Sequence, residues 1–355
     1  MRNAMRNLVL TLMGCLGLAG CSDGTAARPG RFNAARLEAG VAAVERAAAS
    51  PVLGSLQAVA RVTGDVSASR RTVGGAEWDS AVSDAVRRIA AVTTDAGAAL
   101  IPVMRPSVLG RTFVYDPATR TYVPDGARTG APPNGVRFVL YETANGDPIP
   151  GREVGYADLT DERRSSATTA GIRLVVVSRG VTHLDYSFAL AGSLDAATFE
   201  VRGFLSDGTE RIDFTVTTAH QLFGRGGAAT LDATLAVPRH GFTVTAKAEG
   251  VAGESNGDGE IDLTIASGAD RIEVEARTIE GRLDATFTVN GQLLATATGD
   301  PRAPEIRAES GRELTNEERH ALGAIVSMAQ SLFAFVSDLL EPAGVLLLIA
   351  LGIGG

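Results

Sequence analysis

The chain has 355 residues, of which 45% are hydrophobic and 21% charged, and its formal net charge is −8 at pH 7. This length allows a sizeable buried core. The acidic balance argues against nucleic acid and anionic lipid headgroups as partners, because both would repel the chain. The two cysteines, Cys15 and Cys21, both lie near the N-terminus, so we expect the rest of the chain to be stabilised by packing without disulfides.

Residues 1–20 have the layout of a cleavable secretory signal peptide. Arg2 and Arg6 give a positive start, and an uncharged apolar run over residues 8–16 follows. This run is shorter than the roughly 20 apolar residues that a membrane-spanning helix needs. The sequence therefore predicts export rather than insertion as a transmembrane helix.

The signal ends in Leu18-Ala19-Gly20-Cys21, which resembles the lipobox of bacterial lipoproteins. The resemblance implies that the thiol of Cys21 is joined to a diacylglycerol and that cleavage falls between Gly20 and Cys21. Ser22 follows in place of an acidic residue, which by the same resemblance implies sorting to the outer membrane, facing the periplasm or the cell surface. An ordinary secretory signal with a chance cysteine is the alternative interpretation.

After the signal we expect a tether and one globular domain over residues 33–355. Residues 21–32 are mostly small or polar and predict a lipidated tether. Residues 33–109 predict a small set of helices, with Asn33 as a cap of the first. Apolar residues at helical spacing place these helices within the ranges 33–50, 53–62 and 77–89.

Residues 110–300 change to a period of two, which predicts a long antiparallel β-meander. In the segment 211–216, apolar residues alternate with charged or hydroxylated ones. The same alternation recurs in 242–247, 261–265, 272–275 and 286–289. One face of the predicted sheet is thus apolar and the other polar, as in a sheet with one solvated side.

Hairpin turns are predicted at several points in this region. The segment 116–119 lies between two short strand patterns. Asp207-Gly208 and Asn290-Gly291 suit two-residue turns, because these residue types tolerate positive φ. Gly268-Ala269 and Glu280-Gly281 indicate similar reversals.

Residues 301–355 predict a C-terminal apolar helix and tail. Thr315 and Glu318 have the spacing of a capping box, and apolar residues at helical spacing continue to residue 340 before Pro342. Residues 343–355 lack polar side chains, and we expect part of them to meet membrane or another protein. The predicted fold class is mainly β with helices (α+β), a long curved antiparallel meander packed on this C-terminal helix, with small N-terminal helices.

In outline, this architecture is similar to the half-barrel of the outer-membrane lipoprotein localisation factors. Three short stretches also resemble a group of uncharacterised bacterial lipoproteins. They are Thr112-Phe113-Val114-Tyr115-Asp116, Arg128-Thr129-Gly130-Ala131-Pro132 and Gly155-Tyr156-Ala157-Asp158-Leu159-Thr160-Asp161. This second resemblance implies no particular activity.

The sequence offers few candidates for catalysis. Of the four histidines, His183 has a carboxylate, Asp185, on the same face of a predicted strand, but no nucleophile accompanies the pair. The chain lacks the G-x-S-x-G nucleophile elbow and the phosphate-binding loop. We therefore expect a protein that is not an enzyme and needs no cofactor.

The best chemical candidate is the acidic segment 254–262, which resembles the first nine positions of a calcium loop. Its candidate ligands are Asn256, Asp258, Glu260 and Asp262. The position where a bidentate glutamate is expected holds Ile265 instead. An acidic hairpin loop explains the same residues through turn propensity, so the metal assignment is the weaker of the two readings.

Together these features predict a lipid-anchored protein of the cell envelope with a structural or interaction role. Its partners are expected to be the membrane, through the anchor, and a protein or lipid, but not nucleic acid. The alternative is a periplasmic carrier or sensor of lipids or other amphiphiles, with a cavity between the sheet and the C-terminal helix.

Overall fold

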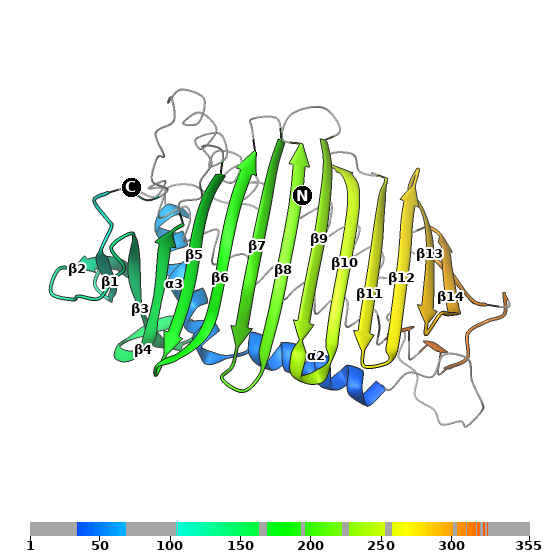
Figure 1. Cartoon of the computed structure of the whole chain (residues 1–355), viewed down its shortest axis with the longest axis horizontal. Helices are drawn as coiled ribbons and strands as arrows, with labels where there is room; N and C mark the ends of the chain where they lie inside the picture. Colours follow the sequence, from blue (N-terminus) through cyan, green and yellow to red (C-terminus); the bar gives the residue numbers. More distant parts are fainter. Residues whose placement is uncertain are drawn as a thin grey trace. The chain divides into compact units, whose positions relative to one another are not determined.

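The computed structural model describes residues 34–68, 104, 106–162, 169–192, 196–221, 227–252, 258–300, 304–309 and 311–316, with 318, 319, 322, 323 and 325. Two helices and fifteen strands have defined bounds (Figure 1). The helices are α2 (Ala34–Ala48) and α3 (Pro51–Ala68). The first eight strands are β1 (Arg111–Asp116), β2 (Thr121–Asp125), β3 (Gly135–Ala144), β4 (Asp147–Asp161), β5 (Thr169–Ser178), β6 (Val181–Gly192), β7 (Ala196–Ser206) and β8 (Arg211–Gln221). The others are β9 (Gly227–Val237), β10 (Phe242–Ala252), β11 (Gly259–Ser267), β12 (Asp270–Ile279), β13 (Arg282–Val289), β14 (Gln292–Gly299) and β15 (Glu305–Ala308), and a short 3-10 helix, η1 (Pro238–His240), precedes β10.

The strands form one sheet in which each strand from β3 to β15 neighbours the next along the chain. The pairing of β1 with β3 is parallel, whereas β1 and β2, the strands from β3 to β7 and those from β9 to β15 pair antiparallel. At the end of the order, β1 lies between β3 and β2. The long meander predicted for residues 110–300 is therefore present, and the prediction of a mainly β protein is confirmed.

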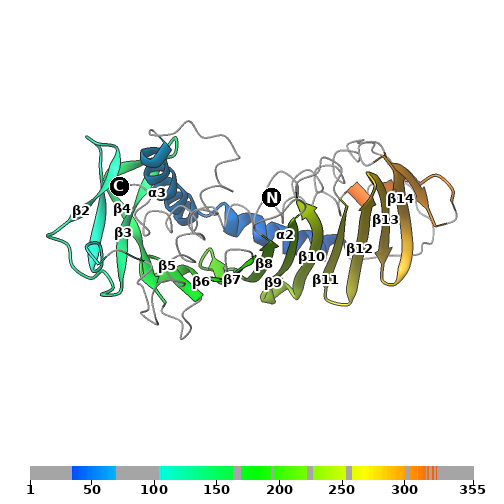
Figure 2. The same ribbon diagram turned by 90° about the horizontal axis from the view of Figure 1, so that it is seen from above.

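By its internal contacts the chain divides into two compact units. Unit 1 comprises Met1–Glu45 and Phe214–Phe335, and unit 2 comprises Arg46–Asp213 and Val336–Gly355. In unit 2, α3 contacts β2, β3 and β4 (Figure 2). Leu53, Leu56 and Val59 of α3 are buried, as are Phe138, Leu140 and Leu159 of the strands. This apolar layer is the core of unit 2, and its burial is the main source of stability there.

In unit 1, most apolar positions of the strands are buried and the alternate positions are exposed or half-buried. The buried positions include Val244, Ile265, Ile272 and Phe287. Gly40 of α2 lies directly against Phe242 of β10, so α2 packs on this apolar face. The alternation predicted from the sequence is confirmed strand by strand.

The prediction of a meander packed on a C-terminal helix is wrong. Within the described part of the chain, the helices with defined bounds are α2 and α3, both close to the N-terminus. The apolar period over 322–340 indicates helical spacing but does not specify which face of the sheet a helix covers. Leu322 and Ile325 are buried in helical conformation, while the positions after 325 lie outside the described residues.

Two helical predictions for the N-terminal region are confirmed, since α2 and α3 fall where helices were expected at 33–50 and 53–62. The helix predicted over 77–89 lies outside the described residues, as do the signal peptide and the tether. Among the described residues, no helix combines the length and apolarity needed to span a bilayer.

The turns largely follow the predictions. Two-residue loops join β11 to β12, β12 to β13 and β13 to β14, at Gly268-Ala269, Glu280-Gly281 and Asn290-Gly291. The loop at Asp207-Gly208 is instead four residues long, running from Asp207 to Glu210. The reason is the Asp207 side chain, whose Oδ1 accepts hydrogen bonds of 2.7 Å from the backbone N–H groups of Thr209 and Glu210 and so closes a wider turn.

Candidate functional site

The predicted lipidation site, Gly20 and Cys21, lies outside the described residues, as does Asn256 of the calcium candidate. Asp258 accepts a hydrogen bond of 2.8 Å from the backbone N–H of Glu280. Glu260 accepts hydrogen bonds of 3.0 and 2.7 Å from Nε and Nη2 of Arg277. These two carboxylates are thus engaged in holding β11 to β12 and the turn beside them.

Asp262, the remaining calcium candidate, lies in β11 directly opposite Lys247 on one side and Glu275 on the other. Among the described side chains, no group of three or more His, Cys, Asp or Glu residues has the arrangement of a metal site. Because Asn256 is outside that set, the calcium site stays a prediction.

The two residues of the histidine candidate have separate partners. Both carboxylate oxygens of Asp185 accept hydrogen bonds of 2.7 Å from Arg173. Nδ1 of His183 lies 2.9 Å from the carbonyl oxygen of Ser206. The carboxylate therefore orients the neighbouring guanidinium rather than the imidazole.

The three stretches singled out by their resemblance to uncharacterised lipoproteins come together in unit 2, around Arg137 of β3. Nε and Nη2 of Arg137 each donate a hydrogen bond of 2.7 Å to the carboxylate of Asp158 in β4. The guanidinium carbon lies 3.7 Å from the centre of the Tyr156 ring. The ion pair with Asp158 raises the pKa of Arg137, and the cation–π contact adds to its fixed position.

The loop after β2 covers this cation closely. A Cβ built on Gly130 would lie 3.1 Å from Nη1 of Arg137, and Gly130 has a φ of +97°. Only glycine adopts this backbone conformation without strain. On the other side, Thr112 of β1 is directly opposite Arg137 in the parallel register. Thr112 is buried, and its Oγ1 has no hydrogen-bond partner among the described residues.

An aromatic cluster lies on the opposite face of the same strands, because Phe113 and Phe138 pair one residue after Thr112 and Arg137. The rings of Phe113 and Phe138 stack with their centres 5.3 Å apart, and the ring of Tyr122 meets Phe138 edge-on at 5.8 Å. The Tyr122 hydroxyl donates a hydrogen bond of 3.0 Å to the carbonyl oxygen of Val139. Burial raises the pKa of Tyr122 well above its usual range, so this hydroxyl acts as a neutral donor.

A second ion pair flanks the cluster. Arg128 donates from both terminal nitrogens to the carboxylate of Glu153, and its Nε lies 3.5 Å from the carboxylate of Asp125. The hydrogen bonds from Arg128 lower the pKa of Glu153. The loop that carries Arg128 is thereby fixed to β4.

We call the set Thr112, Arg128, Gly130, Arg137, Glu153, Tyr156 and Asp158 the Arg137 cluster. Its charged groups are paired with one another, Arg137 with Asp158 and Arg128 with Glu153. The three stretches were visible in the sequence. Arg137 and Glu153 were missed, because their roles depend on the strand register.

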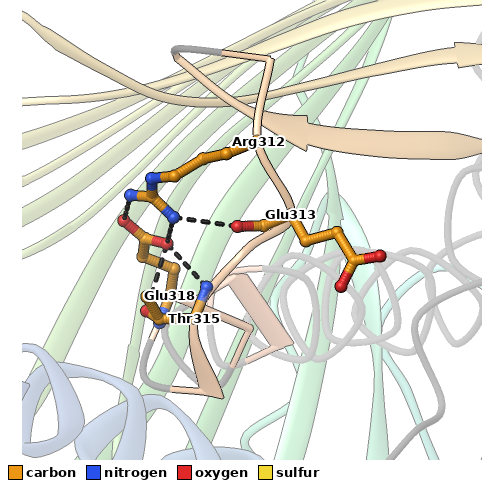
Figure 3. Close-up of polar contacts among 4 residues, drawn as sticks. All are labelled: Arg312, Glu313, Thr315 and Glu318. Carbon is orange, nitrogen blue, oxygen red and sulfur yellow. Dashed lines mark hydrogen bonds and ion pairs between the residues drawn. The ribbon is translucent and has the colours of Figure 1, made fainter.

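A separate polar cluster in unit 1 connects the chain after β15 to the residues that follow (Figure 3). Glu318 accepts hydrogen bonds from Arg312 at 2.8 and 2.5 Å and from the backbone N–H of Thr315 at 2.8 Å. The backbone N–H of Glu318 in turn donates to Oγ1 of Thr315 at 3.3 Å. This reciprocal pattern confirms the predicted capping box. The hydrogen bonds from Arg312 lower the pKa of Glu318 to about 2.

Comparisons with known proteins return no relative: no family model, no curated protein and no solved structure matches this chain.

Proposed function

We propose that this protein is a lipid-anchored protein of the bacterial outer membrane with a structural or interaction role and no enzymatic activity. The lipobox-like segment ending in Cys21 supports the anchor. One observation carries the proposed role. In unit 1 the apolar face of the strands is buried, whereas the opposite face is polar and carries ion pairs between its own side chains, which suits a structural scaffold better than a reaction centre.

The pairing on the polar face supports this reading. In unit 2, Arg137 pairs with Asp158 and Arg173 with Asp185, each across neighbouring strands. In unit 1, Arg277 pairs with Glu260 in the same way. Groups engaged in such pairs are held in one ionisation state and one position. A catalytic acid or base must instead gain and lose a proton near the working pH.

The edges of the sheet support a discrete scaffold as well. One edge strand, β2, is short and contains Pro124, which has no backbone N–H to offer a further strand. The other, β15, is shorter still and carries Glu305 and Arg307. Short, charged or proline-containing edges discourage uncontrolled strand addition.

The proposed anchor is tested with two matched cysteine variants of the full chain. Cys21→Ser removes the only thiol that the lipobox can acylate, so we expect loss of palmitate labelling and release from the membrane fraction. Cys15→Ser leaves the lipobox intact, so labelling and fractionation should be unchanged. Persistent labelling of Cys21→Ser, or its loss in Cys15→Ser, would overturn the anchor.

The proposed role is tested by native mass spectrometry after gentle extraction of the lipidated protein. A structural or interaction protein should give the mass of the acylated chain alone. A reproducible additional lipid, retained in the Cys21→Ser variant, would favour a carrier of amphiphiles instead.

A further inference from the structure

Three hairpins of unit 1 carry the same short sequence pattern in their first strand. In each strand the pattern ends three residues before the strand does. The pattern is apolar, Asp, apolar, Thr, with the apolar residues on the buried face. It reads Leu231-Asp232-Ala233-Thr234 in β9, Ile261-Asp262-Leu263-Thr264 in β11 and Leu283-Asp284-Ala285-Thr286 in β13. In Figure 1 the three hairpins β9–β10, β11–β12 and β13–β14 lie side by side.

In each hairpin the threonine of the pattern lies three residues before the end of the first strand. Its partner is the fourth residue of the second strand in β10 and β12, and the fifth in β14, where a β-bulge follows Phe287. The threonines Thr234, Thr264 and Thr286 lie opposite Thr245, Glu273 and Thr296. The aspartates Asp232, Asp262 and Asp284 lie opposite Lys247, Glu275 and Thr298. The buried partners are also alike: Leu235 faces Val244, Ile265 faces Ile272 and Phe287 faces Ala295.

We propose that β9–β14 are three copies of one hairpin module and that the array is a spacer whose width is set by the number of copies. Each copy buries one apolar face and pairs with its neighbours through its edges, as repeat modules do. Neighbouring strands are about 4.8 Å apart, so each module contributes roughly 10 Å of width.

We call the contact between the second strand of one module and the first strand of the next a joint. The two joints place the same types of charged residue opposite one another. At the first joint, between β10 and β11, Lys247 lies opposite Asp262, and Asp232 lies on its other side. At the second, between β12 and β13, Arg277 lies opposite Asp284, with Glu260 on its other side. In both cases a cation is placed between two carboxylates of the neighbouring strands, which stabilises the exposed face.

The two joints differ by two residues in register. Thr245 lies opposite Thr264 at the first joint, whereas the equivalent Glu273 lies opposite Thr288 at the second. Because side chains alternate with a period of two, this shift leaves every apolar residue on the buried face. The modules therefore fit one another in more than one register.

The module assignment depends only on strand pairing, whereas the spacer role also rests on the proposed lipid-anchored structural function. The test is made on the otherwise intact chain. Removing residues 259–280 deletes one hairpin and joins Asp258 to Gly281. Asp258 then leads into β13, and Lys247 acquires Asp284 as its partner in place of Asp262. Thr245 acquires Thr286 in place of Thr264, so each type of pair is kept.

The control deletion is shorter than the first, and it removes a single strand instead of a whole hairpin. Deleting residues 270–281 takes out β12 and joins the Gly268-Ala269 turn to Arg282. With this two-residue turn, Ile265 would lie opposite Asp284, which places apolar and charged residues on one face. Loss of one strand also reverses the chain direction of β13, β14 and β15. The residues after β15, including Leu314, which is buried in the intact chain, would then follow from the opposite end of the strands.

We expect the chain lacking 259–280 to unfold cooperatively with a β-sheet circular dichroism spectrum, and the chain lacking 270–281 to lose its cooperative transition. Loss of cooperative unfolding in the first variant, or an equal tolerance of both deletions, would overturn the module assignment. Membrane fractionation of the first variant is a separate readout. Release from the membrane would count against the anchor and not against the modules.

The spacer width is tested with spin labels at Thr245→Cys and Thr296→Cys in a background that carries both Cys15→Ser and Cys21→Ser, so that the two labels occupy the only thiols. These positions are separated by four strand spacings in the intact chain and by two after the deletion of 259–280. The distance between labels should fall from about 20 Å to about 10 Å. An unchanged distance in the folded variant would overturn the spacer.

Discussion

Gly40 of α2 lies so close to Phe242 of β10 that a Cβ built on Gly40 would be 2.5 Å from two carbons of the Phe242 ring. Its distance to Cβ of Phe242 would be 2.9 Å. Because these atoms are near the backbone of β10, the ring cannot swing away at little cost. The absent side chain at position 40 is therefore what allows α2 to approach the sheet in unit 1.

This relationship predicts opposite effects for two glycine-to-alanine changes in helices. Gly40→Ala should lower the free energy of unfolding by about 1–3 kcal/mol, because it overpacks the contact with Phe242. Gly54→Ala in α3 should raise it by about 0.5–1 kcal/mol, since nothing lies within 4 Å of the new Cβ and alanine is the better helix former. Thermal or urea unfolding of both variants measures the difference, and equal effects would contradict the close approach at Gly40.

The second prediction concerns the burial of ion pairs. Arg137–Asp158 and Arg173–Asp185 have the same bidentate geometry, with hydrogen bonds of 2.7 Å. The side chains of the first pair are 21% and 17% exposed and those of the second 46% and 23%. Removing one partner of a buried pair leaves an uncompensated charge, whereas exposed pairs contribute little.

We therefore expect Arg137→Leu to cost about 2–3 kcal/mol and Arg173→Leu less than about 1 kcal/mol. Adding Asp158→Leu to Arg137→Leu should restore part of the loss, because the double variant buries no unpaired charge. A double-mutant cycle by urea unfolding measures this coupling. Additive losses at Arg137 and Asp158 would show that the pair contributes nothing as a unit.

The strands, their faces and most of the turns could be predicted because they depend on local periodicity. Ile212, Phe214 and Val216 alternate with polar neighbours, and all three are buried as expected. The same kind of reasoning placed α2 and α3. These features are contained in segments of a few residues, so no long-range information is required.

The packing partner of the sheet and the Arg137 cluster could not be predicted in this way. Arg137 and Asp158 belong to one hairpin, but register shifts between Leu140 and Thr143 move their pairing away from the one that the Asn145-Gly146 turn alone would give. The apolar stripe after Thr315 likewise indicates helical spacing without indicating which element covers the sheet. Gly40 was not singled out either, although a glycine inside a helical pattern often marks a close contact.

The third prediction is a pH dependence at Glu318. Its pKa is lowered from 4.5 to about 2, chiefly by the hydrogen bonds from Arg312. A carboxyl with a depressed pKa in the folded state contributes stability that is present above its ordinary pKa. This contribution is lost as the pH falls from about 4.5 towards 2. We expect wild-type protein to lose stability in this window relative to Glu318→Gln.

The matched control for this prediction is Glu313→Gln. Glu313 contacts Arg312 through its backbone carbonyl, at 2.9 Å, and its side chain points away from the cluster in Figure 3. Glu318→Gln should cost about 1 kcal/mol at pH 6, in the range of a lost helix cap, and Glu313→Gln almost nothing. Melting curves at pH 6, 4 and 3 for the three proteins provide the comparison, and parallel pH profiles would rule out the role of Glu318.

The last prediction concerns the hairpin turns with left-handed residues. Asn145-Gly146, Arg179-Gly180, Glu280-Gly281 and Asn290-Gly291 all have positive φ at both positions. This is the conformation of a two-residue type I′ turn, in which asparagine is preferred at the first position. Arg179, with a φ of 51°, occupies that position between β5 and β6. A left-handed conformation costs most L-residues about 1–2 kcal/mol.

Arg179→Asn should therefore stabilise the protein by about 0.5–1 kcal/mol, since asparagine tolerates this conformation better. The reverse change, Asn290→Arg, should destabilise it more strongly. Oδ1 of Asn290 accepts a hydrogen bond of 2.8 Å from the backbone N–H of Arg271, and its Nδ2 donates one of 3.2 Å to Asp270. Asn290→Arg thus loses these hydrogen bonds in addition to the turn preference. Arg179→Asn, in contrast, only relieves the strain of the left-handed conformation. Thermal melting of both variants distinguishes the two contributions, and a lowered melting temperature for Arg179→Asn would contradict the type I′ assignment of that turn.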